Sequence, residues 1–363
     1  MENKSLARRI SVVVLTHNRA DKLIATLERL LALPEKPPIF VADNASDDNT
    51  VALVKARYPT VCVIECRENL GAAARNQAVA CVRTDYVAFC DDDAWWEPGS
   101  LERAVQLLDA WPNVGVLSAH VVVGDAKLTD PACALMRASP LGSVLLPGPA
   151  LTGYLAGACV FRTALFRAVG GYEARLFRGG EAELVALDVL TAGHAIVYCD
   201  QLTVHHHPSS VRDGSLRRRM LARNAAWIAW LRLPWRQACR ATLNALKSLS
   251  REASFARDSA ALLRGLAWTL PERRVVPLHV LGPYMRVRAA EQRSAASTEN
   301  TGATAASGQI DARTCCNGAP TRNRKARGRR RHPGSRSRRS VRAGRLAASP
   351  SLRGLHLLAE KPR

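Results

Sequence analysis

The feature of this chain that most constrains its fold is a series of four short apolar runs, each followed by a segment long enough for a helix. The runs show no regular alternation of polar and apolar residues, which is typical of strands buried on both faces of a sheet. They are Ile10 to Leu15, Pro38 to Ala42, Val61 to Glu65 and Asp85 to Cys90. Strands that alternate with helices at this pace predict βαβ units, so we expect an α/β fold with a mainly parallel sheet.

The rest of the first two hundred residues extends this alternation. Helical spacing predicts helices over 21–33, 46–57, 71–82, 98–110, 163–169 and 181–192. Apolar runs predict strands over 114–123, 156–161 and 195–199,. Residues 131–152 are rich in Pro, Gly and Ser, so we expect an irregular loop there, near the edge of the sheet that binds ligands,.

Polar residues gather directly after three of the predicted strands. They are Thr16 and Asn18 after the first strand, Asp43 and Asn44 after the second, and Asp91, Asp92 and Asp93 after the fourth. In open α/β sheets, ligands bind at the carboxyl ends of the strands. We therefore expect one ligand-binding edge that brings the three clusters together.

The acidic triplet at 91–93 indicates what this edge binds. Adjacent carboxylates repel one another, and a hard divalent cation such as Mg²⁺ or Mn²⁺ is the usual counter-charge, because oxygen ligands suit it and it also takes substrate phosphates. A solvated turn that caps the next helix is the alternative.

Charge divides the chain into three parts, although the net charge of the whole is +21. Residues 1–211 carry 19 Lys and Arg against 23 Asp and Glu, residues 212–288 carry 16 against 4, and residues 289–363 carry 17 against 4. We expect a globular domain over 1–211, a basic amphipathic helical extension over 212–290 and a disordered Arg-rich tail over 291–363. A shifted reading frame is an alternative origin for the tail.

The sequence favours a cytoplasmic protein, with peripheral contact at the inner face of the membrane as a further possibility. The ten cysteines show no C-x-x-C spacing, and reduced, packed thiols are their simplest interpretation,. No secretory signal is visible at the N-terminus. No apolar run approaches the roughly 18–20 residues that span a bilayer.

The order of motifs resembles family 2 glycosyltransferases, which have the nucleotide-sugar-binding GT-A fold. The motifs cover about residues 10–210 and are VVVLTHNR (12–19), VADNAS (41–46), NLGAAARN (69–76), YVAFCDDD (86–93), VGGY (169–172), GEAEL (180–184) and VHHH (204–207). The resemblance implies transfer of a sugar from a nucleotide diphosphate. It also implies that the donor-binding residues are Thr16, Asn18, Asp43, Asn44, Gly71, Arg75, Asp91 and Asp92.

Within that set, Asp43 falls where the family accepts a base N–H, which weakly favours UDP or dTDP. An Asx-turn is the alternative for Asp43, and a structural salt bridge is the alternative for Arg75. The resemblance implies that Mg²⁺ or Mn²⁺ is held by Asp93 and His206, with Asp91 at the metal or the ribose. His205 and His207 are close alternatives to His206.

The resemblance also implies a catalytic base. Glu181 falls at the position of the family's catalytic Asp, and Glu183 at a later acidic position, while Gly180 replaces the leading Glu. One carboxylate base predicts direct displacement with inversion. Because aromatic faces suit sugar C–H surfaces, Trp95 and Trp96 are candidate sugar or acceptor contacts, as is Glu183, although one tryptophan could belong to the core.

A single-addition transferase fits this pattern better than a processive synthase, because no Q-x-x-R-W motif follows. A glycan, lipid-linked or small-molecule acceptor is expected, and the arginines and tryptophans of 212–288 suit an anionic membrane surface. The alternatives are a non-catalytic nucleotide-sugar or glycan-binding protein and nonspecific nucleic-acid binding through the basic C-terminal third. We expect no specific nucleic acid, since no folded nucleic-acid module is apparent.

Overall fold

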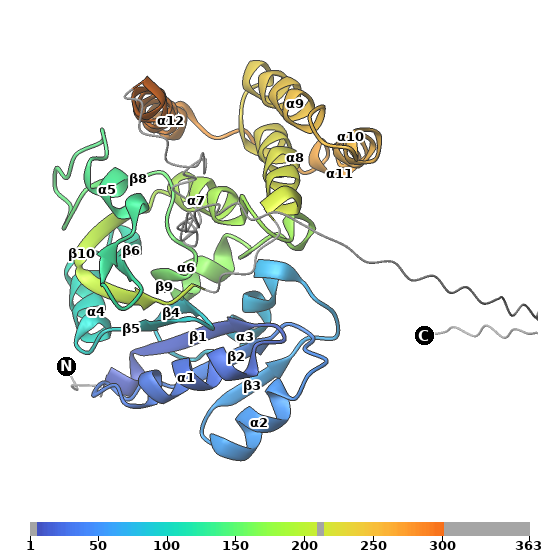
Figure 1. Ribbon diagram of the computed structural model, residues 1–363. Helices are drawn as coiled ribbons and strands as arrows, with labels where there is room; N and C mark the ends of the chain where they lie inside the picture. Colours follow the sequence, from blue (N-terminus) through green and yellow to red (C-terminus); the bar gives the residue numbers. More distant parts are fainter. Residues whose placement is uncertain (1–5, 209–213, 301–363) are drawn as a thin grey trace, which may run out of the picture. The chain divides into compact units, whose positions relative to one another are not determined.

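A computed structural model describes residues 6–208 and 214–300, with side chains described to residue 294 (Figure 1). The strands are β1 (Ile10–Thr16), β2 (Ile39–Asp43), β3 (Cys62–Glu65), β4 (Tyr86–Asp91), β5 (Ala94–Trp96), β6 (Val114–Val123), β7 (Leu128–Thr129), β8 (Ala150–Leu151), β9 (Ala158–Arg162) and β10 (Ala195–His206). The α-helices are α1 (Ala20–Leu31), α2 (Thr50–Arg57), α3 (Ala74–Cys81), α4 (Ser100–Ala110), α5 (Pro131–Arg137), α6 (Thr163–Ala168), α7 (Glu181–Thr191), α8 (Gly214–Arg232), α9 (Trp235–Leu249), α10 (Phe255–Arg264), α11 (Leu266–Thr269) and α12 (Leu278–Asn300). Short 3₁₀ turns are η1 (Leu6–Arg8), η2 (Gly71–Ala73) and η3 (Ala174–Leu176).

The strands form one sheet in the order β3-β2-β1-β4-β9-β6-β10-β5. The pairs from β3 to β4 are parallel, as is the pair of β6 with β10. In contrast, β9 runs antiparallel to both of its neighbours, and β5 runs antiparallel to β10. The predicted α/β fold is confirmed, and the sheet is mixed because β9 is inserted between its two parallel halves.

The register of the parallel half brings the polar clusters to one edge. Thr16 lies opposite Asp43 in the pairing of β1 with β2, and Leu15 lies opposite Asp91 in the pairing of β1 with β4. The three clusters that follow these strands are therefore neighbours in space, as the sequence predicted.

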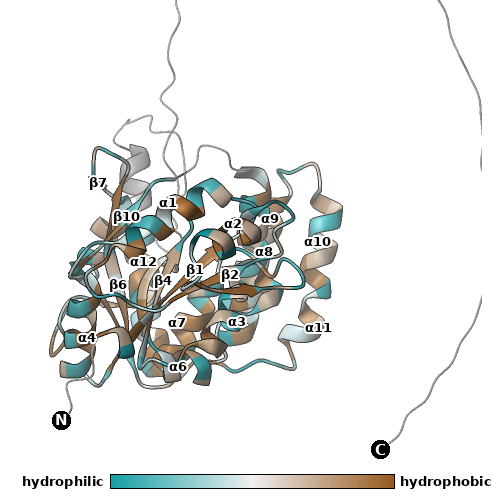
Figure 2. Cartoon of the chain, turned by 90° about the horizontal axis from the view of Figure 1, so that it is seen from below, coloured by the Kyte–Doolittle hydropathy of each residue, from teal (hydrophilic) through white to brown (hydrophobic). Residues whose placement is uncertain are grey.

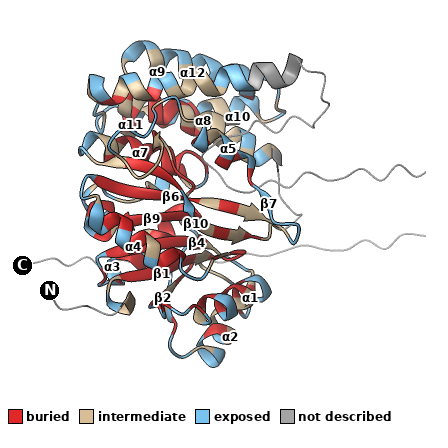
Figure 3. Ribbon diagram, turned by 90° about the vertical axis from the view of Figure 1, so that its left-hand side faces the viewer, coloured by how far each residue is buried: buried red, intermediate tan, exposed pale blue. Residues whose placement is uncertain are grey.

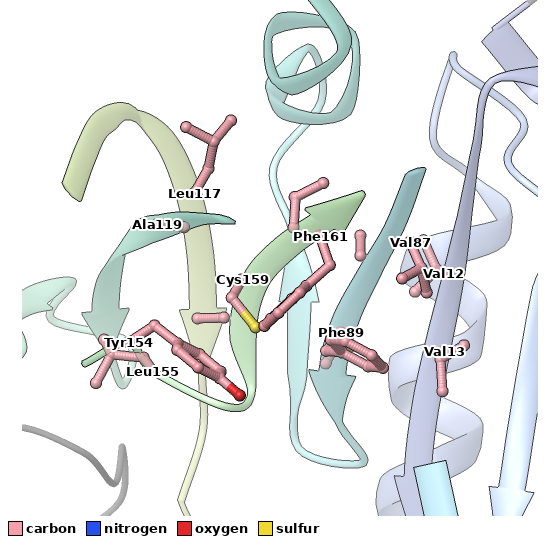
Figure 4. Packing of buried hydrophobic residues seen from close by; sticks show 14 of the residues in the cluster. Val12, Val13, Val87, Phe89, Leu117, Ala119, Tyr154, Leu155, Cys159 and Phe161 are labelled. Atoms are coloured by element: carbon pink, nitrogen blue, oxygen red, sulfur yellow. The ribbon is translucent and has the colours of Figure 1, made fainter. Parts of the chain in front are cut away.

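The core lies along the middle strands. The residues of these strands are mostly apolar (Figure 2) and buried (Figure 3). Phe89 of β4 contacts Phe161 of β9 edge to face, with ring centroids 5.9 Å apart, and Tyr154 packs on the other side of Phe161 at 5.0 Å (Figure 4). This burial on both faces explains why the runs read as continuously apolar.

Two segments differ from the sequence expectation. Residues 131–137, predicted as irregular loop, form α5, because Pro131 takes the first helical position and Asp130 accepts a hydrogen bond from Ala132 N at 2.8 Å,. Strand β10 continues to His206, well beyond the predicted 195–199, because its second half pairs with the unpredicted strand β5.

The basic segment after the sheet is helical, as predicted. Helices α8, α9 and α12 share a second apolar core with α7, to which Leu184 and Leu187 contribute. Helix α12 continues to residue 300, so the first ten residues of the predicted disordered tail are helical. The rest of that tail, 301–363, lies outside the described residues. None of the described helices is long and apolar enough to span a membrane.

Candidate active site

The acidic triplet lies where β4 ends, and each of its carboxylates already has a partner. Thr16 Oγ1 donates a hydrogen bond of 3.0 Å to Asp92 Oδ2. Arg19 lies across the triplet, with Nη1 2.5 Å from Asp92 Oδ1 and Nη2 2.8 Å from Asp93 Oδ2. Arg75 pairs with Asp91. Two arginines thus supply the counter-charge that three adjacent carboxylates require.

The three carboxylates differ in their environment. The Asp91 side chain is 31% exposed, whereas that of Asp93 is 1% exposed. Burial raises the pKa of Asp92 to about 7, even though Arg19 favours its ionised form. Burial also disfavours ionisation of Asp93, but hydrogen bonds from His206 and Arg19 outweigh it and lower its pKa to about 2. Asp93 is therefore a permanent anion at neutral pH, which suits a cation ligand.

Of the three histidines, the structure brings His206 to the triplet. His206 Nε2 lies 3.5 Å from Asp93 Oδ1, and both side chains are buried. His205 instead faces Glu97 at 3.6 Å, and His207 faces Asp125 at 3.7 Å. His205 and His206 belong to strand β10 rather than to a loop after it, and alternation along a strand explains why neighbours point apart,.

The two tryptophans after the triplet have different surroundings. Trp96 is completely buried in the core, so its expected contact with a sugar or acceptor is wrong. Trp95 is half-buried and stacks on His205 with ring centroids 5.5 Å apart, and the Arg29 guanidinium lies 4.1 Å from its ring centroid. A sugar contact by Trp95 stays a prediction.

Asp43 forms the Asx-turn that was its alternative interpretation, and a contact of its second carboxylate oxygen with a base stays a prediction. Its Oδ2 accepts a hydrogen bond from Ser46 N at 3.0 Å, which is the Asx-turn geometry,. Its Oδ1 is buried and has no hydrogen-bond partner within the described residues. A buried acceptor without a partner is costly in a folded protein, and a donor N–H of a bound base would satisfy it.

Two asparagines that are expected to contact the nucleotide form hydrogen bonds between loops. Asn44 Oδ1 accepts from Leu70 N at 2.7 Å, while its Nδ2 donates to Gly71 O at 3.0 Å. Asn18 Oδ1 accepts from Asp47 N at 2.8 Å. Both side chains hold the shape of the edge, and a direct nucleotide contact by either stays a prediction.

Gly71 and Arg75 lie between the sheet edge that carries the polar clusters and the loop that precedes Glu181. Gly71 has a φ of +59°, and a Cβ there would lie 1.9 Å from Phe177 O. Packing against this loop therefore requires a glycine at 71, independently of any nucleotide. Arg75, on helix α3 after this turn, is buried and contacts Asp91 of the acidic triplet. Residues 71–75 therefore contact both the loop before Glu181 and the triplet.

Glu181 is the first residue of α7 and is buried. The residue before it, Gly180, has a φ of +87°, and a Cβ there would lie 2.6 Å from Ile228 Cδ1 of α8. A glutamate at this position would adopt a strained backbone conformation and would require the Ile228 side chain to move, so the backbone favours a glycine at 180,.

Asn224 of α8 is a site residue that the sequence did not single out. Its side chain is completely buried, and its Nδ2 lies 2.8, 3.1 and 2.6 Å from the carbonyl oxygens of Leu176, Arg178 and Gly179. On the other side of the same loop, Ala72 N donates to Phe177 O at 2.9 Å. The loop before Glu181 is thus held by both the donor edge and the helical extension.

Glu183 faces α12 rather than an open surface. It is 4% exposed, and Tyr284 OH of α12 donates a hydrogen bond to its Oε1. The expected contact of Glu183 with a sugar or acceptor is therefore not supported. Tyr284, like Arg19 and Asn224, was missed by sequence reasoning, and of the three only Arg19 carried a signal, as part of the quoted run 12–19.

The residues at the triplet fit a divalent cation that is shared with a phosphate. Within residues 6–208 and 214–300, no group of three or more His, Cys, Asp or Glu side chains is arranged to hold a metal by itself. Mg²⁺ commonly uses only one or two protein carboxylates together with substrate phosphates. The carboxylates of Asp93 and the more exposed Asp91 match that donor set, and His206 lies beside Asp93 as a nitrogen ligand of a kind less usual for Mg²⁺,.

Comparisons with known proteins agree with this geometry. Residues 11–168 match the model of glycosyl transferase family 2. This segment belongs to that family. An N-acetylglucosaminyl-diphospho-decaprenol L-rhamnosyltransferase from Mycobacterium tuberculosis is 26% identical over 236 residues, which cover 54% of this chain and 76% of the relative. A UDP-Glc:α-D-GlcNAc-diphosphoundecaprenol β-1,3-glucosyltransferase from Escherichia coli is 27% identical over 103 residues, or 28% of this chain and 41% of that protein.

The comparison with solved structures shows the fold. The structure of GalNAc-T7 with UDP, GalNAc and Mn²⁺ superposes with a TM-score of 0.52 at 16% identity, covering 77% of this chain and 59% of that one. The expected GT-A fold is confirmed, and the protein is a glycosyltransferase.

Proposed function

We propose that this glycosyltransferase transfers a single sugar, with inversion, from a nucleotide diphosphate to a hydroxyl of a lipid-linked sugar acceptor. In this proposal residues 1–211 form the catalytic domain and 212–290 a helical extension that supports it. The observation that carries the proposal is that segment 72–75 contacts both parts of the site: Arg75 pairs with Asp91 of the acidic triplet, and Ala72 N donates to Phe177 O at 2.9 Å in the loop before Glu181. These contacts support a site that includes both the acidic triplet and Glu181.

Asp93 and His206 would hold Mg²⁺ or Mn²⁺, and the ion would stabilise the negative charge that grows on the leaving nucleoside diphosphate. The Mn²⁺ bound in the GalNAc-T7 structure supports this assignment. Arg19 contacts both Asp92 and Asp93, so it balances the charge of the triplet when the donor is absent. The free Oδ1 of Asp43 would accept the base N–H, which favours UDP or dTDP.

Glu181 would remove the proton of the acceptor hydroxyl as that oxygen attacks the anomeric carbon. The sugar–phosphate bond breaks on the opposite face, so the anomeric configuration inverts. A single carboxylate base is what direct displacement needs. The non-catalytic alternative is not favoured, because the positive φ at 180 favours a glycine there and the substitution leaves the carboxylate at 181 in place,.

The lipid-linked acceptor follows from the names of the two relatives, which act on sugars carried by decaprenol and undecaprenol diphosphates. The basic helices agree with a cytoplasmic protein that visits the inner face of the membrane. Helix α9 carries three basic residues and no acidic one, and Arg236, Arg240 and Lys247 are all exposed. An anionic lipid surface attracts such a helix.

A thermal-shift panel of nucleotide sugars with and without Mn²⁺ tests the proposal. One donor should raise the Tm by several degrees only when Mn²⁺ is present, because a ligand that binds the native state stabilises it. Asp93→Asn should abolish the Mn²⁺-dependent part of the shift. Donor stabilisation that is equal with and without metal would contradict the metal assignment. Transfer to free sugars but not to polyprenyl-diphosphate sugars would contradict the acceptor.

A further inference from the structure

Two adjoining cavities lie between the segment from α5 to β8 and helix α12. The smaller has a volume of about 80 Å³ and lies between Met136, Pro140 and the side chains of Val287 and Ala290. The larger, about 270 Å³, lies between β8 and the first turns of α12. Both are lined by Leu151 and Thr152, so they form one groove along α12. Figure 1 shows α12 above α5 and β8.

The lining of the groove is mainly apolar, with one guanidinium at the larger cavity. Leu190, Ile196, Val280 and Pro283 line the larger cavity together with Arg286 and His279. Within the described residues, Arg286 has no ion-pair partner. Glu291 lines the smaller cavity, and its carboxylate lies 3.6 Å from Arg288. A ligand that fits this groove has an apolar chain and an anionic group near the larger cavity.

The two segments that form the groove also carry the most exposed large apolar side chains in the described part of the chain. Val144 is 84% exposed, Leu145 80% and Leu278 84%. Side chains of this kind are costly to leave in water and are typical of surfaces that meet a membrane or an apolar ligand. The two segments that line the groove therefore also expose apolar side chains to solvent.

The groove is connected to the active site along two paths. Helix α7 begins at Glu181, and its Leu190 lines the larger cavity. At 1.5 Å per residue, Leu190 lies about 14 Å from Glu181 along the helix axis. The chain that leaves the groove at Gly153 reaches Gly157, where a Cβ would lie 2.5 Å from Asp91 Oδ2. The distance of about 14 Å between Glu181 and Leu190 is comparable with the length of a monosaccharide diphosphate.

We infer that this groove binds the first isoprene units of the acceptor's polyprenyl chain, with Arg286 at the acceptor diphosphate. The inference rests on the proposed lipid-linked acceptor and names the place where its lipid lies. The acceptor sugar then reaches Glu181, while Val144, Leu145 and Leu278 rest in the surface of the bilayer from which the chain comes.

The test compares two acceptors that share the same sugar diphosphate, one on a long isoprenoid chain and one on a short water-soluble alkyl chain. Ala290→Trp fills the smaller cavity and should raise KM for the long-chain acceptor about tenfold, with kcat/KM for the short-chain acceptor unchanged. Ala267→Trp, at an exposed alanine of α11, is the matched control and should change neither. Arg286→Gln should raise KM for both, because both carry the diphosphate.

Equal effects of Ala290→Trp on the two acceptors, or no effect on either, would overturn the inference. If Ala290→Trp lowers the Tm by several degrees, the smaller Ala290→Leu serves in the same comparison. Binding of a fluorescent isoprenyl diphosphate is measured separately and should weaken about tenfold in the filled variant. If the wild-type protein binds the isoprenyl diphosphate but transfers no sugar to lipid-linked acceptors, the proposed acceptor is wrong and the groove assignment holds. If it transfers sugar to lipid-linked acceptors without such binding, the groove assignment is wrong and the proposed acceptor holds.

Discussion

The sheet edge and the helical extension contribute to the same site in different ways. In the proposed function, the edge supplies the side chains that would face the donor, from loops that follow β1, β2 and β4. The extension supplies none of these, yet Asn224 of α8 holds the loop before Glu181 from 48 residues away in sequence. Tyr284 of α12 bonds Glu183 across 101 residues. The candidate donor-binding residues thus come from the ends of strands, whereas the position of the candidate base depends on helices that follow the sheet.

The largest expected effect concerns the base itself. Glu181→Gln keeps the shape of the side chain but removes its ability to take a proton, so kcat should fall by about 10²–10⁴ while the Tm shift with donor and Mn²⁺ persists. Glu183→Gln, the same change two residues along the same helix, is the matched control. Its loss of kcat should be far smaller, because Glu183 packs against α12. Comparable losses in the two variants would remove Glu181 from its assigned role.

The next effect tests whether the extension places the base. Asn224→Ala removes the donor to three buried carbonyls, which should lower the free energy of unfolding by about 1–3 kcal/mol. Loosening of the loop should lower kcat up to about 10²-fold, since small displacements of a catalytic group cost rate steeply. Donor binding should not change, because the donor edge keeps its own contacts.

Thr242→Ala is the control for Asn224→Ala. It removes the acceptor of Trp230 Nε1, at 2.9 Å, elsewhere in the extension. If both variants lose stability but only Asn224→Ala loses kcat, the extension positions the base. A parallel loss of kcat in both would mean that the extension acts only through overall stability.

Most of the sheet edge was predictable from the sequence, because its elements are encoded locally. The runs that form β1 and β4 are apolar throughout since both faces are buried, and polar residues begin where each strand reaches the surface. The register then brings Thr16, Asp43 and Asp91 together without further information. Helix α5 was missed because the Pro, Gly and Ser residues of 131–152 lie mostly after it, so the segment as a whole reads as a loop, and Asp130 and Pro131 signal the start of the helix.

The role of the extension was not predictable in the same way. Asn224 lies in a helix of basic residues, and nothing near it in sequence shows that its amide meets a loop from another part of the chain. The same holds for Gly180, which reads as a departure from the family pattern until Ile228 is seen beside it. Contacts between distant segments set these residues, and no local pattern records them.

A smaller effect is expected at the contact between α12 and α7. Tyr284→Phe removes a hydrogen bond to the buried Glu183 carboxylate, and bonds to charged groups contribute about 1.5–3 kcal/mol. The free energy of unfolding should fall by that amount, and kcat by less than about tenfold, because Glu181 lies on the turn held by Asn224. Tyr198→Phe, which removes a hydroxyl 2.9 Å from His120 Nδ1 outside the site, is the control. A larger loss of kcat than in Asn224→Ala would show that α12, rather than α8, places the base.

The smallest effect concerns the ion pair that joins η3 to the extension. Arg175 Nη1 lies 2.7 Å from Glu272 Oε1, but the two side chains are 41% and 48% exposed, so Glu272→Gln should lower the free energy of unfolding by only about 0–1 kcal/mol,.

Arg175 also contacts Glu173, and its hydrogen bond holds the pKa of Glu173 below its usual 4.5. A lowered carboxyl pKa stabilises the fold above that value, and the stabilisation is lost as the pH falls below it. Denaturation of wild type and Arg175→Ala should therefore give a difference in unfolding free energy that is constant from about pH 7 to about pH 5 and shrinks below about pH 4.5. A difference that stays constant down to about pH 3 would mean that Arg175 acts through its packing on Trp268, where its guanidinium lies 3.9 Å from the ring centroid, rather than through charge.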